Sequence, residues 1–173
     1  MTKKEITESL IQKHHLFSER IHALTNAEFI SAKPEKWSSG QQLDHIIKSV
    51  GVLTSAYSIP KGAPNFVFGT TDRPSISYEE LVENYRNILK NGGKASERFL
   101  PDAIEINQKE ILIEKLNKLI ERLNSHVGNY SEAELDTFTV PHPIMGTLTL
   151  REILYFTIYH VHHHHQLMLQ NLE

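Results

Sequence analysis

Two histidines in the last apolar segment of the chain, His160 and His164, have the spacing of a helical metal-binding pair. Residues four apart lie one above the other on the same face of an α-helix. The face of this pair also carries Val161 and Met168, so we expect it to point into the core. Two imidazoles placed in this way can bind one divalent ion, an arrangement that helical zinc enzymes use.

A third histidine, His45, lies about 115 residues earlier in the sequence. Its neighbours Leu43, Ile46 and Val50 follow helical spacing, which indicates a buried helix side close to His45. A third imidazole from a second helix would complete a three-His site with an open coordination position. A catalytic metal needs that position to hold water or substrate. On the residue pattern alone, a metal site and hydrogen-bonded core histidines are equally good interpretations.

Four consecutive histidines at 162–165 follow His160 within the same helical segment. We interpret them as native helix rather than as a purification tag, because an apolar stretch continues the segment after Gln166. Four successive residues cover all sides of a helix, so at most two can share one site. We expect His162 and His165 to face solvent or a cavity rim.

The histidine run leaves the register of the pair open, because His160 with His163 competes with His160 and His164. The apolar stripe favours His164. His163 lies on the side of Tyr155, Tyr159 and Gln166, which we expect to be wetter.

Other polar residues are weaker candidates for the site. Asp44 points about 100° away from His45 on a helix, so we interpret it as an exposed or capping carboxylate. Glu152 has capping-box spacing from Thr149. His142 lies in a proline-flanked loop and is a candidate substrate contact, although a structural role is the favoured interpretation. We expect Trp37 to pack at the start of the second helix, and four histidines to be surface residues: His14, His15, His22 and His126.

The composition is that of one ordinary globular domain spanning residues 1–173, with 39% hydrophobic and 23% charged residues. A formal net charge of −3 gives no general electrostatic reason to bind nucleic acid or an anionic membrane. No signal peptide or membrane span is expected. The absence of cysteine excludes disulfides, thiolate metal sites and a cysteine nucleophile, and it agrees with a cytoplasmic location.

Apolar periodicity and capping signals predict a mostly helical chain. The predicted helices span residues 3–24, 38–57, 78–91, 108–128 and 150–171. The segments 59–76, with Pro60, Pro64 and Pro74, and 129–148 are predicted to be loops. No serine-nucleophile motif, phosphate-binding glycine loop or basic aromatic patch is present.

Two stretches, Trp37-Ser-Ser-Gly-Gln-Gln-Leu-Asp-His45 and Gly146-Thr-Leu-Thr-Leu-Arg-Glu-Ile-Leu-Tyr-Phe-Thr-Ile-Tyr-His160-Val-His-His-His164, resemble the DinB/YfiT-like superfamily. The resemblance implies an all-α, up-and-down four-helix bundle with an additional helix. It also implies a three-His metal site made of His45, His160 and His164. Zinc or nickel, a water at the open position and frequent homodimers are further implications. The segments 59–76 and 78–91 match no shared motif.

Relatives in that superfamily include hydrolases and enzymes that use low-molecular-weight thiols, such as thiol S-transferases and a mycothiol-dependent isomerase. The leading hypothesis is therefore a metal-dependent hydrolase or thiol S-transferase acting on a small molecule. Because the chain has no cysteine, a thiolate would come from a small-molecule cosubstrate. The alternatives are a non-catalytic metal-binding or stress-associated protein, and a helical interaction protein without metal.

Overall fold

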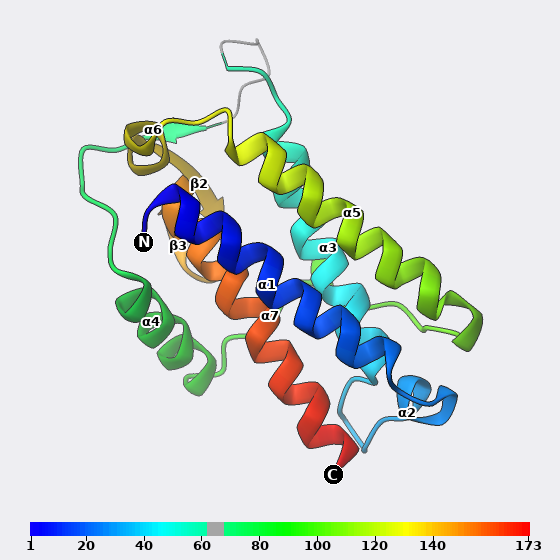
Figure 1. Ribbon diagram of the computed structural model, residues 1–173. Coiled ribbons are helices and arrows are strands. Elements are labelled where there is room, and N and C mark those ends of the chain that lie inside the picture. The colour runs from blue at the N-terminus through cyan, green and yellow to red at the C-terminus, as the bar shows by residue number, and fades with distance from the viewer. Residues whose placement is uncertain (62–67) are drawn as a thin grey trace.

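The computed structural model describes residues 1–61 and 68–173, and most of them are helical. The longer helices are α1 (Lys3–His22), α3 (Ser39–Tyr57), α4 (Tyr78–Lys90), α5 (Lys109–Val127) and α7 (Leu150–Leu172) (Figure 1). Shorter elements are α2 (Asn26–Ile30), α6 (Glu132–Thr137) and the 3-10 turns η1 (Glu97–Phe99) and η2 (Ile106–Gln108). The strands are β1 (Gly69–Thr70), β2 (Phe138–His142) and β3 (Gly146–Thr149). The prediction of a mostly helical chain is confirmed.

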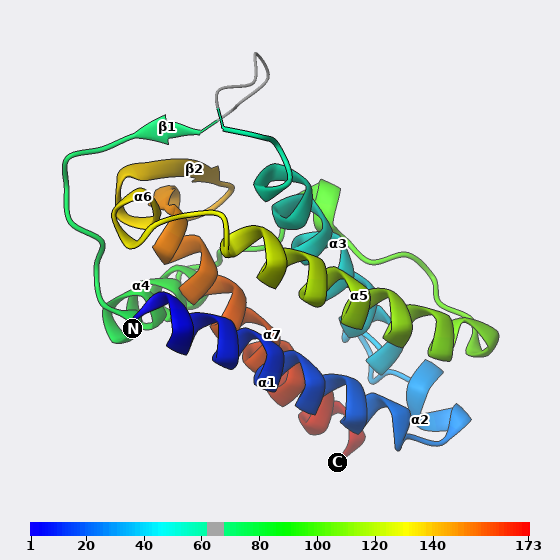
Figure 2. The same ribbon diagram turned by 45° about the horizontal axis from the view of Figure 1, so that its top comes forward.

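Helices α1, α3, α5 and α7 pack around one apolar core (Figure 2). Helix α5 packs against both α1 and α3, and α7 packs against the other sides of these two helices. Each helix contributes fully buried apolar side chains, among them Leu10, Phe17, Leu43, Leu116, Leu123 and Leu154. Burial of this shared face, more than local propensity, holds the helices together.

The four long helices do not follow the up-and-down order that the resemblance implied. Lys109 at the start of α5 donates from Nζ to the carbonyls of His22 and Leu24 at the end of α1, so these two helices are antiparallel. Tyr57 at the end of α3 and Tyr130 just after α5 have ring centroids 5.2 Å apart. The ends of α3 and α5 therefore lie together, and the two helices run in the same direction. The long connection through α4 makes this possible, because it returns the chain to the other end before α5 begins.

The predicted boundaries of the five longer helices are confirmed to within two residues. The predicted loop at 129–148 is wrong, because it contains α6 and an antiparallel hairpin of β2 and β3. The predicted loop at 59–76 includes the short strand β1, which pairs with β2. Pro64 lies outside the described residues.

The hairpin accommodates Pro141 because of where the strands end. Among the described residues, β1 pairs with Phe138 and Thr139, and Pro141 pairs with Thr147 of β3, so Pro141 lies beyond the described pairing with β1. A proline, which has no N–H to donate, is tolerated at such a position. Gly146 opposite His142 has φ of +75°, a conformation that strongly favours glycine.

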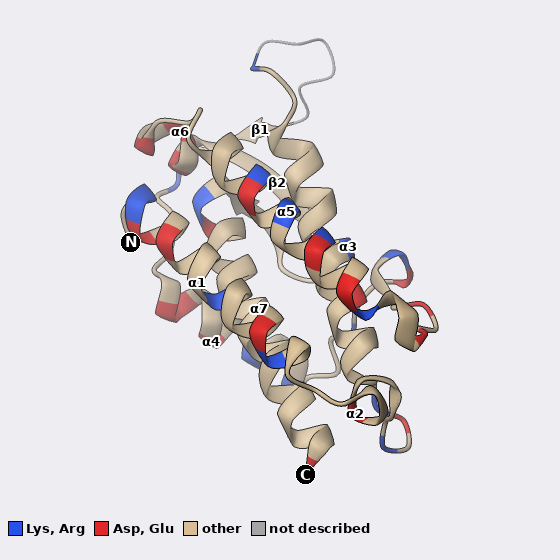
Figure 3. Ribbon diagram, turned by 45° about the vertical axis from the view of Figure 1, so that its right-hand side comes forward, with Lys and Arg blue, Asp and Glu red and all other residues tan. Residues whose placement is uncertain are grey.

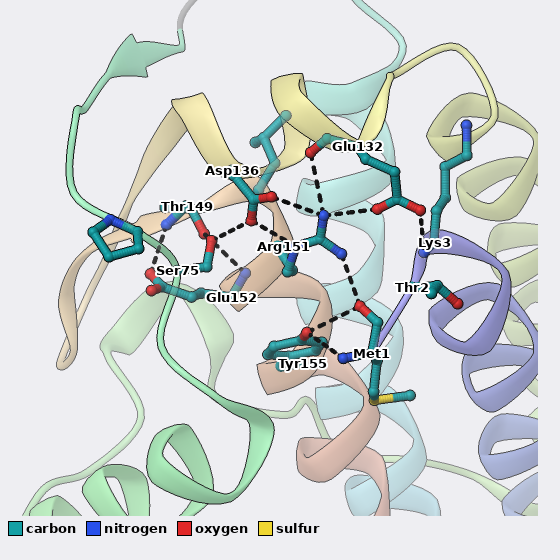
Figure 4. Close-up of polar contacts among 12 residues, drawn as sticks. Met1, Thr2, Lys3, Ser75, Glu132, Asp136, Thr149, Arg151, Glu152 and Tyr155 are labelled. Atoms are coloured by element: carbon teal, nitrogen blue, oxygen red, sulfur yellow. Dashed lines mark hydrogen bonds and ion pairs between the residues drawn. The ribbon is translucent and has the colours of Figure 1, made fainter.

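The start of α7, which carries the histidines, is held by an extensive polar network (Figure 4). Thr149 caps the helix and forms the predicted capping box with Glu152. Arg151 forms ion pairs with Glu132 and Asp136, and it donates to the carbonyl of Met1. These contacts fix α7 against α6 and the start of α1.

Glu152 also binds residues that precede α4. Its carboxylate is fully buried and pairs with Arg73 at 2.5 Å, while the backbone N–H of Ile76 donates to the same carboxylate. Because a buried carboxylate without partners is costly, this pairing restrains the segment before α4 against α7. Helix α4 then packs along α7.

The outer face of α5 is charged, with Lys and Arg interspersed among Glu residues (Figure 3). Lys118 and Glu114, one turn apart, form an exposed ion pair there. Within the described ranges, no helix combines the length and apolarity that a membrane crossing requires.

Candidate metal centre

The three histidines singled out from the sequence meet in the core between α3 and α7. The Nε2 atom of His160 lies 3.2 Å from Nε2 of His45 and 3.0 Å from Nε2 of His164. One ring nitrogen from each side chain lies within 4.8 Å of the others. All three side chains are buried.

His45 is oriented by a backbone carbonyl from the connection between α4 and α5. Its Nδ1–H donates to the carbonyl of Phe99 at 2.6 Å. The proton therefore resides on Nδ1, and Nε2 presents a lone pair to His160. Such an outer contact is the usual way in which proteins set the tautomer of a metal-binding histidine.

His164 is oriented by α3. Its Nδ1–H donates to Oε1 of Gln42, which lies three residues before His45 on the same helix. Helix α3 thus supplies both one of the three imidazoles and the group that orients another. As in His45, the Nε2 lone pair of His164 faces His160.

In this arrangement the buried Nε2 lone pairs outnumber the protons that can hydrogen-bond to them. His160 can donate at most one Nε2 proton, whereas two Nε2 lone pairs point at it, from His45 and His164. Burial lowers the pKa of His45, and burial together with the neighbouring histidines lowers the pKa of His160 and His164 well below the ordinary value. The three rings are therefore neutral near pH 7, the form in which imidazole binds metal ions.

His163, the competing partner of His160, is not part of this cluster of Nε2 atoms. Its ring centroid lies 5.2 Å from that of His164 and 6.0 Å from that of Tyr85. The expectation that His163 shares a wetter side with Tyr155, Tyr159 and Gln166 is wrong for the two tyrosines, which are buried, whereas Gln166 is exposed and His163 is half-buried. Helix α4 packs on that side of α7 and buries the two tyrosines.

Trp37 forms a wall of the site. Its indole stacks on His164 and lies 5.0 Å from the ring of His45. The expected packing at the start of α3 is present, and Trp37 contacts two of the three imidazoles as well.

A cavity of about 900 Å³ opens onto the three imidazoles. Its inner wall is mostly apolar and includes Ile46, Val50, Leu53, Leu89, Ile153 and Phe156. Tyr85 of α4 also lines the cavity, and burial raises the pKa of its hydroxyl to about 12. The phenol therefore keeps its proton at neutral pH and is available as a hydrogen-bond donor.

His142, the candidate substrate contact, lines this cavity at the end of β2. Its Nδ1 accepts the backbone N–H of Met145 at 3.2 Å, and its ring packs on Phe156 with centroids 4.3 Å apart. Burial lowers its pKa to about 4. His142 is thus neutral with its proton on Nε2.

His14 was expected at the surface, and this expectation is wrong. The side chain is 1% exposed, lines the cavity and donates from Nδ1 to the carbonyl of Leu10 at 2.8 Å. Among the described residues, its Nε2 has no hydrogen-bond partner. The other three histidines of that group behave differently, since His15 and His22 are exposed and His126 is half-buried.

Asp44 is also more buried than expected. Its carboxylate forms an ion pair with Lys48 at 2.9 Å and accepts the backbone N–H of Asp102 at 3.0 Å. It is not part of the three-His group. Its role is to hold the connection between α4 and α5 against α3, and that connection carries Phe99.

Gln42 and the carbonyl of Phe99 are the groups that sequence reasoning missed. Gln42 lies one turn before His45 on the buried side of α3, and this spacing was a usable signal. No pattern in the sequence indicates that the carbonyl of Phe99 reaches His45.

Comparison with protein-family models matches residues 9–168 to the DinB superfamily. Searches of the curated proteins and of the solved structures found no match.

Proposed function

The chain belongs to the DinB superfamily, and from this premise we propose that it is an enzyme that uses a divalent metal ion, zinc or nickel, bound by His45, His160 and His164. The reaction that we propose is hydrolysis of a small molecule or transfer of a low-molecular-weight thiol. The four long helices then form the helical bundle of this superfamily, with the site between α3 and α7.

The observation that carries the proposal is the arrangement of the three Nε2 atoms. Two outer hydrogen bonds, from His45 to Phe99 and from His164 to Gln42, turn two lone pairs toward His160. Burying lone pairs against each other without a proton or a cation between them is costly. A divalent ion removes this cost, and three neutral imidazoles are a donor set that zinc and nickel accept.

The surroundings of the cluster support a catalytic rather than a structural ion. Among the described residues, no fourth His, Asp or Glu joins the three imidazoles, so one coordination position is left to a small molecule. The cavity that all three imidazoles line gives that position access to a substrate. Structural zinc sites, by contrast, are closed by four protein ligands.

An ion with an open position acts as a Lewis acid and lowers the pKa of water or of a small thiol that it binds. The chain's own residues prepare the cavity for either reaction. Tyr85 and His142 each present a proton, on the phenol oxygen and on Nε2, for hydrogen bonding to a substrate. Trp37 and Phe156 shield the imidazoles with apolar rings. A thiolate would come from a cosubstrate, since the chain has no cysteine.

The test begins with the metal content of untagged protein purified without a nickel column. We expect one zinc or nickel per chain, and loss of that ion in His45→Ala with the helical content retained. His15→Ala, on the exposed side of α1, is the matched control. Absence of stoichiometric metal in the wild-type protein would refute the proposal.

The second step separates an enzyme from a non-catalytic metal-binding protein. Metal-loaded wild-type protein and His45→Ala are assayed with ester and amide substrates, and with small thiols plus an electrophile. Turnover that requires both the ion and His45 supports the enzyme. Stoichiometric metal without turnover in any of these assays supports the non-catalytic alternative.

A further inference from the structure

The mouth of the cavity is cationic, although the chain as a whole has a formal net charge of −3. Among the described lining residues, the ionised side chains are those of Lys33, Lys36, Lys94 and Arg98, with Glu35 as the carboxylate. Four positive charges against one negative charge surround the opening. The local balance is therefore opposite to that of the whole protein.

These cations come from the two segments that also hold the metal centre. Lys36 directly precedes Trp37, whose ring contacts His45 and His164. Arg98 directly precedes Phe99, whose carbonyl orients His45. Lys36 and Arg98 are therefore covalent neighbours of residues that contact or orient the imidazoles, and all four cations line the cavity that opens onto the site.

Not all of the cations are equally available to a ligand. Lys33 already donates from Nζ to the carbonyl of Gln170 at 2.8 Å, so it also has a structural role. None of the ion pairs among the described residues involves Lys36, Lys94 or Arg98, and Arg98 lies over the ring of Phe99. Lys36, Lys94 and Arg98 are therefore the cations that can bind an incoming group.

The inner part of the cavity has two further features. Its wall is apolar along α3 and α7, which suits a hydrocarbon or aromatic body. The three neutral imidazoles bring no negative charge to a bound divalent ion, and the nearby carboxylate of Asp44 is paired with Lys48. The cavity therefore has positive charge at its mouth and, when a divalent ion is bound, at the metal centre. The wall between these two ends is apolar.

We propose that the cavity binds a small organic anion with an apolar body, whose acid group lies among Lys36, Lys94 and Arg98. This inference rests on the proposed function in one respect, that the apolar body extends toward the three-His site. It identifies the class of substrate as amphipathic acids, such as carboxylates or sulfonates, in place of neutral or cationic molecules.

The test uses a pair of fluorescent probes of matched shape, the anion 1-anilinonaphthalene-8-sulfonate and the uncharged N-phenyl-1-naphthylamine. Energy transfer from Trp37, the single tryptophan and part of the cavity lining, reports a probe bound close to the cavity, and the charge variants show whether the cavity cations hold it. Affinities are measured for zinc-loaded wild-type protein and for the triple variant Lys36→Gln/Lys94→Gln/Arg98→Gln, called the mouth variant below; the control that follows is called the α5 variant. A matched control, Lys115→Gln/Lys118→Gln/Arg122→Gln, removes three exposed cations from α5, and both variants change the formal net charge from −3 to −6.

We expect the mouth variant to bind the sulfonate on the order of tenfold more weakly, since each solvated charge contributes about a factor of two. Binding of the uncharged amine should change by less than about twofold, as should binding of both probes to the α5 variant. Added salt should weaken sulfonate binding to wild-type protein more than to the mouth variant. Circular dichroism checks that both variants are folded.

Three results would overturn the inference. They are equal sulfonate binding by the mouth variant and wild type, an equal loss in the α5 variant, and failure of the wild-type protein to transfer energy from Trp37 to the bound sulfonate. Metal content is measured on the same samples. Charge-dependent sulfonate binding without stoichiometric metal would leave the anion site standing and refute the proposed metal enzyme.

Discussion

Trp37 stacks on His164, with ring centroids 6.0 Å apart and ring planes 10° from parallel. The same indole lies 5.0 Å from the ring of His45. Because Trp37 is the single tryptophan of the chain, its fluorescence reports directly on two of the three proposed ligands.

The first prediction is a change of Trp37 emission on metal binding. Addition of Zn²⁺ or Ni²⁺ to metal-free protein should change the emission and saturate at one ion per chain, because the ion withdraws electron density from the stacked imidazole. His45→Ala should abolish the saturable change, whereas His15→Ala should retain it. Stoichiometric binding seen by calorimetry with unchanged emission would contradict the stacked geometry.

The second prediction concerns the register of the pair on α7. His164→Ala should abolish stoichiometric metal binding, because its Nε2 lies 3.0 Å from that of His160. His163→Ala should leave binding largely intact, since the His163 ring packs beside Tyr85 and Tyr159 instead. Bound metal is measured in both variants after dialysis against a weak chelator. The opposite pattern would mean that His163 is the third ligand.

The third prediction tests the orienting role of Gln42. Gln42→Leu removes the acceptor of the His164 Nδ1–H and should weaken metal affinity by about 10–100-fold. Gln42→Glu keeps an acceptor in place and should restore most of that affinity. The comparison variant is Gln166→Leu on the exposed side of α7. Affinities are measured by competition with a chelator of known strength, and equal affinities in Gln42→Leu and Gln42→Glu would exclude the orienting role.

The convergence of His45, His160 and His164 could be predicted from the sequence for a simple physical reason. On a helix, spacing decides which side chains share a face, and the apolar neighbours decide which face is buried. Helix boundaries were accessible for a similar reason, because Ser38, Ser77 and Thr149 are capping residues at the observed starts.

The wrong predictions concern features that depend on packing between segments far apart in the sequence. His14 is buried because both α5 and α7 pack against α1, which widens the buried side of that helix. Tyr155 and Tyr159 are buried because α4 covers α7. Strands β2 and β3 were missed because five and four residues are too few to show an alternation, and Pro141 argues against a strand. The direction of α5 follows from the path of the long connection through α4, and no pattern in the sequence predicts that path.

The fourth prediction is that His14 makes stability depend on pH. Burial lowers the pKa of His14 to about 4 in the folded chain, against 6.5 for the unperturbed group. Between these values the unfolded state binds a proton at His14 and the folded state does not. Stability should therefore fall as the pH is lowered from 6.5 to 4, by roughly 3 kcal/mol for this residue alone.

His14→Leu should remove most of this contribution. The substitution leaves no unpaired group behind, because the Leu10 carbonyl still accepts the backbone N–H one turn later, and it removes the unpartnered Nε2 atom. At pH 7 we therefore expect the variant to be as stable as wild type or more stable by about 1 kcal/mol. The measurement is urea unfolding of metal-free protein from pH 4 to pH 7.5, where His142 and the three-His cluster contribute equally in both proteins. His15→Leu is the exposed comparison, and a His14→Leu protein whose stability falls with pH as steeply as that of wild type would show that His14 is not the buried neutral group described here.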